Sequence, residues 1–172
     1  MVQFTGWLSQ TSFSLAIQTH EWVVPTIQSI HIVAIGVVQA SVFMIVLRVL
    51  GWAGRDQTLM ETTGRFIPWL FAALCVMLAT GLLMVVGEPA RELLAFSFWL
   101  KMFLVALGTV IAGIFQMAVR RNEADWEASI GKSLGAKSLA IFTLLIWVAI
   151  IILGRLIAYD HVWGSWSHAP RA

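Results

Sequence analysis

Charged residues are scarce in this sequence. They make up 12% of its 172 residues, whereas hydrophobic residues make up 59%. A water-soluble domain of this length needs a larger polar surface, so the shortage of charge excludes an ordinary soluble protein and indicates a membrane protein. Four apolar stretches reach the roughly 20 residues that cross a bilayer core about 30 Å thick. These predicted spans are approximately residues 24–47, 66–86, 96–119 and 139–158.

Cysteine and several short catalytic motifs are also missing or nearly so. Cys75 is the only cysteine, so the chain forms no internal disulfide, and its position inside a span is typical of apolar filling. The sequence has no HExxH, phosphate-loop or CxxCH motif, which leaves metalloprotease, nucleotide-dependent and covalent-haem functions without support. The polar start of the chain has no basic segment, which argues against a cleaved signal peptide.

Basic residues are concentrated around two of the loops. Those that flank or occupy the loops after the first and third spans are Arg48, Arg55, Arg65, Arg120, Arg121, Lys132 and Lys137. Cytoplasmic loops carry such an excess, so both loops are predicted to be cytoplasmic and both termini to face the periplasm of a bacterial inner membrane. These charges set topology and meet anionic lipid, so the net charge of +2 requires no nucleic-acid partner.

The predicted fold is all-α, an integral membrane antiparallel four-helix bundle that forms a single transmembrane domain over residues 1–172. Residues 3–21 place apolar side chains among serine, threonine and glutamine, which predicts an interfacial amphipathic helix on the outer leaflet. Residues 159–172 are predicted to form an outward-facing tail. A bundle of this size is easily multiplied about an axis normal to the membrane, so we expect a homo-oligomer in the lipid bilayer.

Three ionisable side chains lie in the outer halves of the predicted spans. At about 1.5 Å per residue, His31 lies roughly 6 Å to the outer side of the centre of its span, and Lys101 and Arg155 lie roughly 9 Å. Such residues are costly in a bilayer and are commonly functional. Gln28, three residues before His31 on the same helix face, is a candidate to orient the imidazole ring.

A single cofactor accounts for this set of residues. Haem b takes an imidazole as an iron ligand, and cations on neighbouring helices neutralise its propionates. We therefore assign His31 as an axial ligand and place Lys101 and Arg155 at the propionates. The alternatives are that both cations snorkel to the interface or form structural pairs, and that His31 is a core histidine bonded to a backbone carbonyl.

The other three histidines, His20, His161 and His168, are predicted to lie on the same outward side. They are the candidates for a second axial ligand, and four histidines allow one haem or two. His161 and His168 in the tail are also compatible with a copper site or with simple solvation. His20, in the surface helix, is more typical of a structural residue.

Four stretches of the chain resemble a known family: WVVPTIQSIHIVAIGVVQASVFMIVLRVLG, RFIPWLFAALCVMLATGLLM, GEPARELL and FWLKMFLVAL. The family is an uncharacterised bacterial inner-membrane family, catalogued only as a domain of unknown function. The similarity covers most of residues 5–160. It implies the four-helix membrane fold and no particular activity.

The layout is also similar, more distantly, to the membrane protoporphyrinogen oxidase family, which is associated with haem b, and to the transmembrane part of the copper-resistance protein D family. The shared features are His31, Arg48 at the end of the same span, and the element Trp99, Leu100, Lys101. This resemblance implies that His31 and Lys101 belong to a haem site. Two further histidines of the oxidase pattern are absent here, which weakens the oxidase reaction more than haem binding.

The sequence is consistent with three functions. The first is a haem-b membrane cytochrome, a quinone-linked oxidoreductase that transfers electrons between membrane quinone and a redox partner on the outward side. The second is an outward-facing copper-binding or copper-transfer protein that uses the tail histidines, with methionines as softer ligands. The third is a cofactor-free accessory subunit of a larger membrane complex.

Overall fold

The computed structural model describes residues 1–157, and within this range the chain forms eight helices and no strand. Four of the helices are long and apolar enough to cross a membrane: α3 (Val23–Leu50), α4 (Leu59–Gly87), α6 (Phe96–Arg121) and α8 (Leu134–Leu156). The predicted all-α fold with four spans is therefore confirmed, and the chain is a multi-pass membrane protein.

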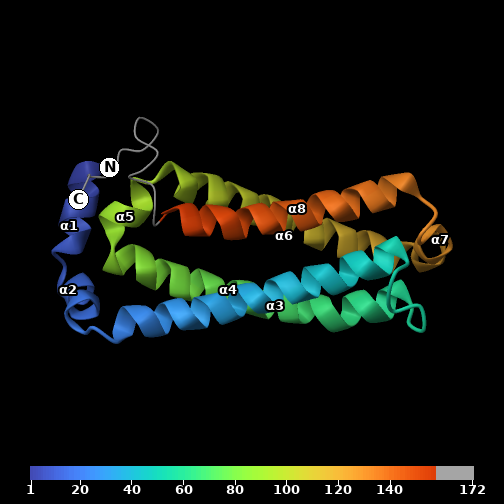
Figure 1. The fold of residues 1–172 in the computed structure, drawn as a ribbon, viewed down its shortest axis with the longest axis horizontal. Coiled ribbons are helices and arrows are strands. Elements are labelled where there is room, and N and C mark those ends of the chain that lie inside the picture. The colour runs from blue at the N-terminus through green and yellow to red at the C-terminus, as the bar shows by residue number, and fades with distance from the viewer. Residues whose placement is uncertain (158–172) are drawn as a thin grey trace.

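The four long helices form two antiparallel pairs. Figure 1 shows α3 beside α4 and α6 beside α8, and the pairs meet where α3 packs against α8 and α4 against α6. Three short helices lie at one end of the bundle, the α5 end: α1 (Val2–Ser9), α2 (Ser12–Thr19) and α5 (Pro89–Leu93). The short helix α7 (Glu123–Ser129) lies at the opposite end, the α7 end.

Two long helices begin before the apolar stretches that predicted them. α4 starts at Leu59 because Thr58 and Glu61 form a reciprocal capping box, in which each side chain bonds the other residue's backbone N–H. α8 starts at Leu134 because the Ser133 hydroxyl accepts a hydrogen bond from the Ala136 N–H at 3.3 Å. Capping therefore extends both helices beyond the hydrophobic core that hydropathy detects.

The amino-terminal segment differs from the single helix predicted over residues 3–21. It is divided into α1 and α2, because the Thr11 hydroxyl accepts a hydrogen bond from the Ser14 N–H and starts a new helix. The two helices cross the α5 end of the bundle (Figure 1). The Ser14 hydroxyl donates a 2.6 Å hydrogen bond to the Val86 carbonyl, and Ile17 packs against Gly87, so α2 is fixed to the end of α4. Lipid-surface contact by α1 and α2 stays a prediction.

The main hydrophobic core lies where α3, α4 and α8 meet. Its buried side chains include Val38, Val42 and Val46 of α3, Leu70 of α4 and Trp147 of α8. An apolar cavity of about 50 Å³ lies between the long helices near the α7 end. A cavity of about 150 Å³ accommodates benzene, so this space is too small for a porphyrin.

Trp147 packs directly on Gly108, and this contact predicts a large asymmetry between two glycines of α6. A Cβ added at Gly108 would lie 3.1 Å from the Trp147 ring, whereas one added at Gly113 would meet no atom within 4 Å. We expect Gly108→Ala to lower the free energy of unfolding by about 1–3 kcal/mol, the usual cost of overpacking a rigid core. Gly113→Ala is the control, since alanine favours a helix by about 0.5–1 kcal/mol over glycine. Unfolding of both variants in mixed detergent micelles measures the difference, and equal stabilities would contradict the contact.

Candidate functional site

His31 is half-buried on α3 and is held by α4. Its Nδ1 lies 2.7 Å from the Thr80 hydroxyl oxygen, and that hydroxyl lies 2.7 Å from the Val76 carbonyl. The Val76 carbonyl can only accept, so Thr80 donates to it and accepts from the Nδ1–H of His31. This relay selects the neutral tautomer whose Nε2 carries a free lone pair, the form in which histidine binds metals.

The relay answers the question of how His31 is oriented. The imidazole is paired with the Thr80 side chain. Its partner is therefore neither Gln28 nor a backbone carbonyl, which were the two partners considered from the sequence. Thr80 can do this because α3 and α4 are packed side by side and its hydroxyl is already fixed to its own helix. A Cβ added at Gly81 would lie 3.7 Å from His31 Cε1, so a small residue also leaves room for the ring.

Lys101 on α6 extends along the bundle near its α5 end. Its ammonium nitrogen lies 5.2 Å from the centre of the Phe98 ring, a cation–π distance. The Lys101 Cδ would lie 4.0 Å from a Cβ added at Gly154 of α8. The aliphatic part of the Lys101 side chain therefore passes the neighbouring helix at a glycine. The Lys101 charge also acts on the Glu92 carboxyl of α5. Lys101 is therefore placed among Phe98, Gly154 and Glu92 near the α5 end.

Arg155 lies in the last turn of α8. It follows Gly154 on α8, and successive residues of a helix point about 100° apart. Its side chain is exposed, with no hydrogen bond or ion pair within residues 1–157. The four-residue pairing with Tyr159 that the sequence allows lies outside the described residues. The roles of Lys101 and Arg155 at haem propionates both stay predictions.

Glu92 is a charged residue that sequence reasoning missed. It lies in α5 and is only 6% exposed. Burial raises the pKa of its carboxyl above the ordinary value, while the positive charges of Lys101 and Arg91 act in the opposite direction. Its sequence signal was weak, because Glu92 stands beside Arg91 in a short segment between two spans.

A small cavity connects Glu92 with Gln28. It has a volume of about 10 Å³ and is lined by both of these side chains, together with Glu88 and apolar residues of α2, α3 and α4. This is about the space of one water molecule. Gln28 therefore faces the carboxylates at the α5 end instead of the imidazole that it was predicted to orient.

The remaining histidines do not complete a metal site within residues 1–157. His20 is exposed at the end of α2, where its Nδ1 lies 2.9 Å from the Ala16 carbonyl of its own helix. His161 and His168 lie outside the described residues. In the described part of the chain, no group of three or more histidine, cysteine, aspartate or glutamate side chains could hold a metal ion.

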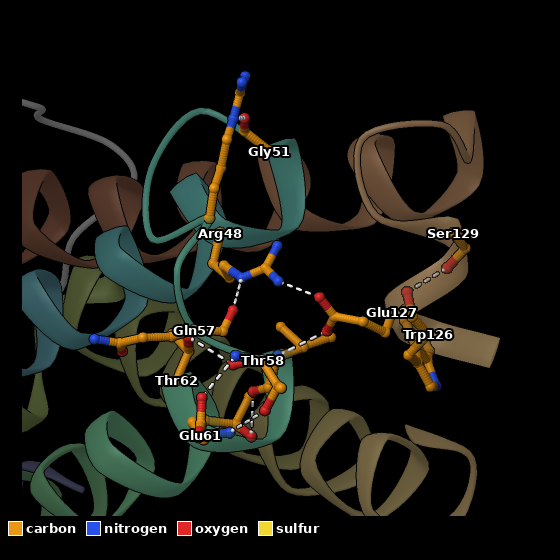
Figure 2. Close-up of polar contacts among 12 residues, drawn as sticks. Arg48, Gly51, Gln57, Thr58, Glu61, Thr62, Trp126, Glu127 and Ser129 are labelled. Atoms are coloured by element: carbon orange, nitrogen blue, oxygen red, sulfur yellow. Dashed lines mark hydrogen bonds and ion pairs between the residues drawn. The ribbon is translucent and has the colours of Figure 1, made fainter. Parts of the chain in front are cut away.

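A second polar cluster lies at the α7 end, around Arg48 (Figure 2). Arg48 is 4% exposed, its Nε donates a 2.8 Å hydrogen bond to the Gln57 carbonyl, and its guanidinium pairs with Glu127 of α7. The second oxygen of Glu127 accepts a 2.8 Å hydrogen bond from the Leu59 N–H at the start of α4. Arg48 was predicted to set topology and was matched to a family motif; in addition, it joins α3, the loop to α4, and α7.

The comparisons with known proteins agree with this architecture. The model of a family of unknown function, DUF6644, matches residues 4–160. The chain belongs to this family. Membership in an uncharacterised family is therefore confirmed, whereas the distant resemblances to membrane protoporphyrinogen oxidases and to copper-resistance protein D stay predictions. No curated protein and no solved structure matches the chain.

Proposed function

We propose that this DUF6644 protein is a haem-b membrane cytochrome that transfers electrons between membrane quinone and a redox partner on the outward side. The observation that carries the proposal is the relay from His31 through Thr80 to Val76. A histidine inside a membrane span, fixed in one tautomer with Nε2 unprotonated, has the form of a metal ligand. Haem b, when bound, supplies a reversible one-electron couple.

Two described residues offer groups that this cofactor uses. His31 offers a neutral Nε2 as one axial ligand, and Thr80 holds the ring in place. Lys101 offers a positive charge on the neighbouring helix α6, suited to a propionate. The second axial ligand is assigned to the pool of His161, His168 and His20 on sequence grounds.

The proposed orientation puts the α5 end on the outward side. The basic residues of the two loops favour a cytoplasmic α7 end, so the proposal takes the membrane to be a bacterial inner membrane with both termini in the periplasm. His31 then lies about 12 Å along α3 from its outward start. Such a position suits electron exchange with a partner outside the membrane, and a homo-oligomer would repeat it around a common axis.

The test is the optical spectrum of the protein purified from membranes. We expect a Soret band, a reduced α-band of b-type haem, and iron in the pyridine haemochrome assay. Elemental analysis separates the alternatives, because copper without iron would support the copper-binding function. A colourless protein with neither metal would overturn the proposal and favour an accessory subunit.

A further inference from the structure

We propose that the small cavity beside Glu92 is a binding site for Na⁺, with Glu92, Glu88 and Gln28 as its oxygen ligands. The cavity lies at the α5 end of the bundle, where α3 begins and α4 ends. Such a site is independent of the proposed haem, because neither His31 nor Lys101 lines the cavity.

Three oxygen-bearing side chains line the cavity. Gln28 stands in the second turn of α3, and Glu88 and Glu92 belong to the segment that follows α4. The other lining residues come from α2, α3 and α4 and are apolar. Carboxylate and amide oxygens are typical ligands of hard cations. Their convergence on an otherwise apolar cavity therefore favours a cation of this class.

Glu92 is the buried ligand that lacks a partner. It is 6% exposed, and within residues 1–157 its carboxylate forms no hydrogen bond and no ion pair. Burial raises the pKa of this carboxyl, because desolvation penalises its charge. The Gln28 side chain also forms no hydrogen bond in the described part of the chain. A bound cation would satisfy both groups and would offset the cost of burying the carboxylate.

The end of α4 adds negative charge to the same cavity. Met84 and Gly87, in the last turn of α4, line the cavity together with Glu92. The carboxyl end of a helix carries about half of a negative elementary charge. In transporter folds, the carboxyl ends of discontinuous helices coordinate Na⁺. The position of Glu92 at this end therefore favours a cation over a neutral occupant.

The fixed cations nearby leave the cavity free and limit its charge. Arg91 pairs with Glu88, and the Lys101 ammonium nitrogen lies 5.2 Å from the centre of the Phe98 ring. Neither cation lines the cavity, although both stabilise the Glu92 carboxylate at longer range. A divalent ion would therefore bring an excess of positive charge into a buried site. A monovalent cation matches the charge of the site better.

The size of the cavity favours Na⁺ over K⁺. Its volume is about 10 Å³, which is the lower limit of the space that a water molecule needs. K⁺ is about as large as a water molecule, whereas Na⁺ is smaller. Glu88 lines the cavity and its side chain is 40% exposed, so the ion reaches Glu92 from the aqueous surface.

The first test is the thermal stability of the purified full-length protein in mixed micelles. NaCl replaces choline chloride at constant ionic strength and about pH 8, well above the ordinary glutamate pKa of 4.5. The Tm of the wild type should rise and saturate, by about 5 °C or more once Na⁺ exceeds its Kd about 100-fold. KCl should have a smaller effect. Equal Tm values in Na⁺ and choline, or equal effects of Na⁺ and K⁺, would overturn the site.

Glu92→Gln should abolish the Na⁺-dependent rise in Tm, because it removes the buried charge that binds the ion. Glu21→Gln is the matched control, since Glu21 lies just before α3 and is exposed. This variant should keep the wild-type response. A response that persists in Glu92→Gln, or that is lost from Glu21→Gln as well, would overturn the assignment to Glu92.

Gln28→Leu keeps the Glu92 charge, so it serves as the second variant in case Glu92→Gln folds poorly. Loss of the amide oxygen should raise the Na⁺ concentration that gives half of the Tm rise by about tenfold or more. An unchanged concentration would overturn the proposed ligand set. A wild-type Tm that depends on pH but not on Na⁺ would also overturn the site, because a proton would then occupy Glu92 in place of the cation.

Discussion

The His31→Ala variant is expected to purify without haem while keeping its fold. Removing the imidazole removes the proposed axial ligand, and no other histidine of residues 1–157 lies inside a span. His31 is half-buried and contributes one hydrogen bond, so its loss costs the bundle about 0.5–1.5 kcal/mol. The readouts are the Soret absorbance per mole of protein and the helical circular dichroism. A folded His31→Ala variant with the full wild-type Soret band would exclude His31 as a ligand.

Thr80→Val tests the relay behind the same ligand. Valine keeps the shape of threonine but removes the oxygen that accepts the Nδ1–H of His31, so the ring loses its fixed tautomer. Changing the partner of a metal-binding histidine typically weakens metal affinity by about 10–100-fold. Gln28→Ala is the control, because Gln28 lines the cavity beside Glu92 and does not hold the ring. Haem titration of the wild type, Thr80→Val and Gln28→Ala should show weaker binding in Thr80→Val only. Equal affinities of the three proteins would contradict the role given to Thr80.

The second large effect is expected at the opposite end of the bundle, where Arg48→Met should destabilise the protein. The variant leaves the Gln57 carbonyl and Glu127 without their partner. Breaking a fully buried pair costs about 3–5 kcal/mol. The Glu127 side chain is 37% exposed, so water screens part of the interaction. We therefore expect a loss of about 2–3 kcal/mol in the free energy of unfolding.

The coupling between Arg48 and Glu127 can be isolated with a double-mutant cycle. Arg48→Met, Glu127→Gln and the double variant should give an interaction energy of about 1–2 kcal/mol. Arg91→Met is the matched control, because Arg91 pairs with Glu88 at the start of α5 and both side chains are exposed, so the pair is worth about 0.5 kcal/mol or less. Unfolding in mixed micelles measures each variant. If Arg48→Met were no less stable than Arg91→Met, burial would add nothing to the stabilisation by the Arg48–Glu127 pair.

The sequence predicted the four spans well because hydropathy over about 20 residues is a strong signal. It was less accurate at the ends of the helices. Thr58 and Ser133 start helices before the apolar stretches begin, and Thr11 divides the amino-terminal segment into two helices. Each of these boundaries depends on one side-chain hydrogen bond to the backbone, which average hydropathy does not detect.

The candidate site was predicted only in part. His31 and Lys101 were found from sequence because an ionisable residue in an apolar span is conspicuous. Arg155 was grouped with them by depth alone; its side chain is exposed, and its part in a haem site stays a prediction. Thr80 was missed, since a threonine in a membrane helix usually bonds its own backbone, and this one does so while also accepting from His31.

By itself, the sequence determined the class of protein, the number of spans and the residues that are costly in a bilayer, because these depend on composition and on one-dimensional spacing. Only the tertiary structure decided which polar groups meet. Thr80 is 49 residues from His31, and Glu127 is 79 residues from Arg48. Both contacts depend on the angle about the helix axis and on the packing of separate helices. The environment of Glu92 depends on helix packing too, because Glu92 shares a small cavity with Ile17 of α2, Gln28 of α3 and Leu83 of α4.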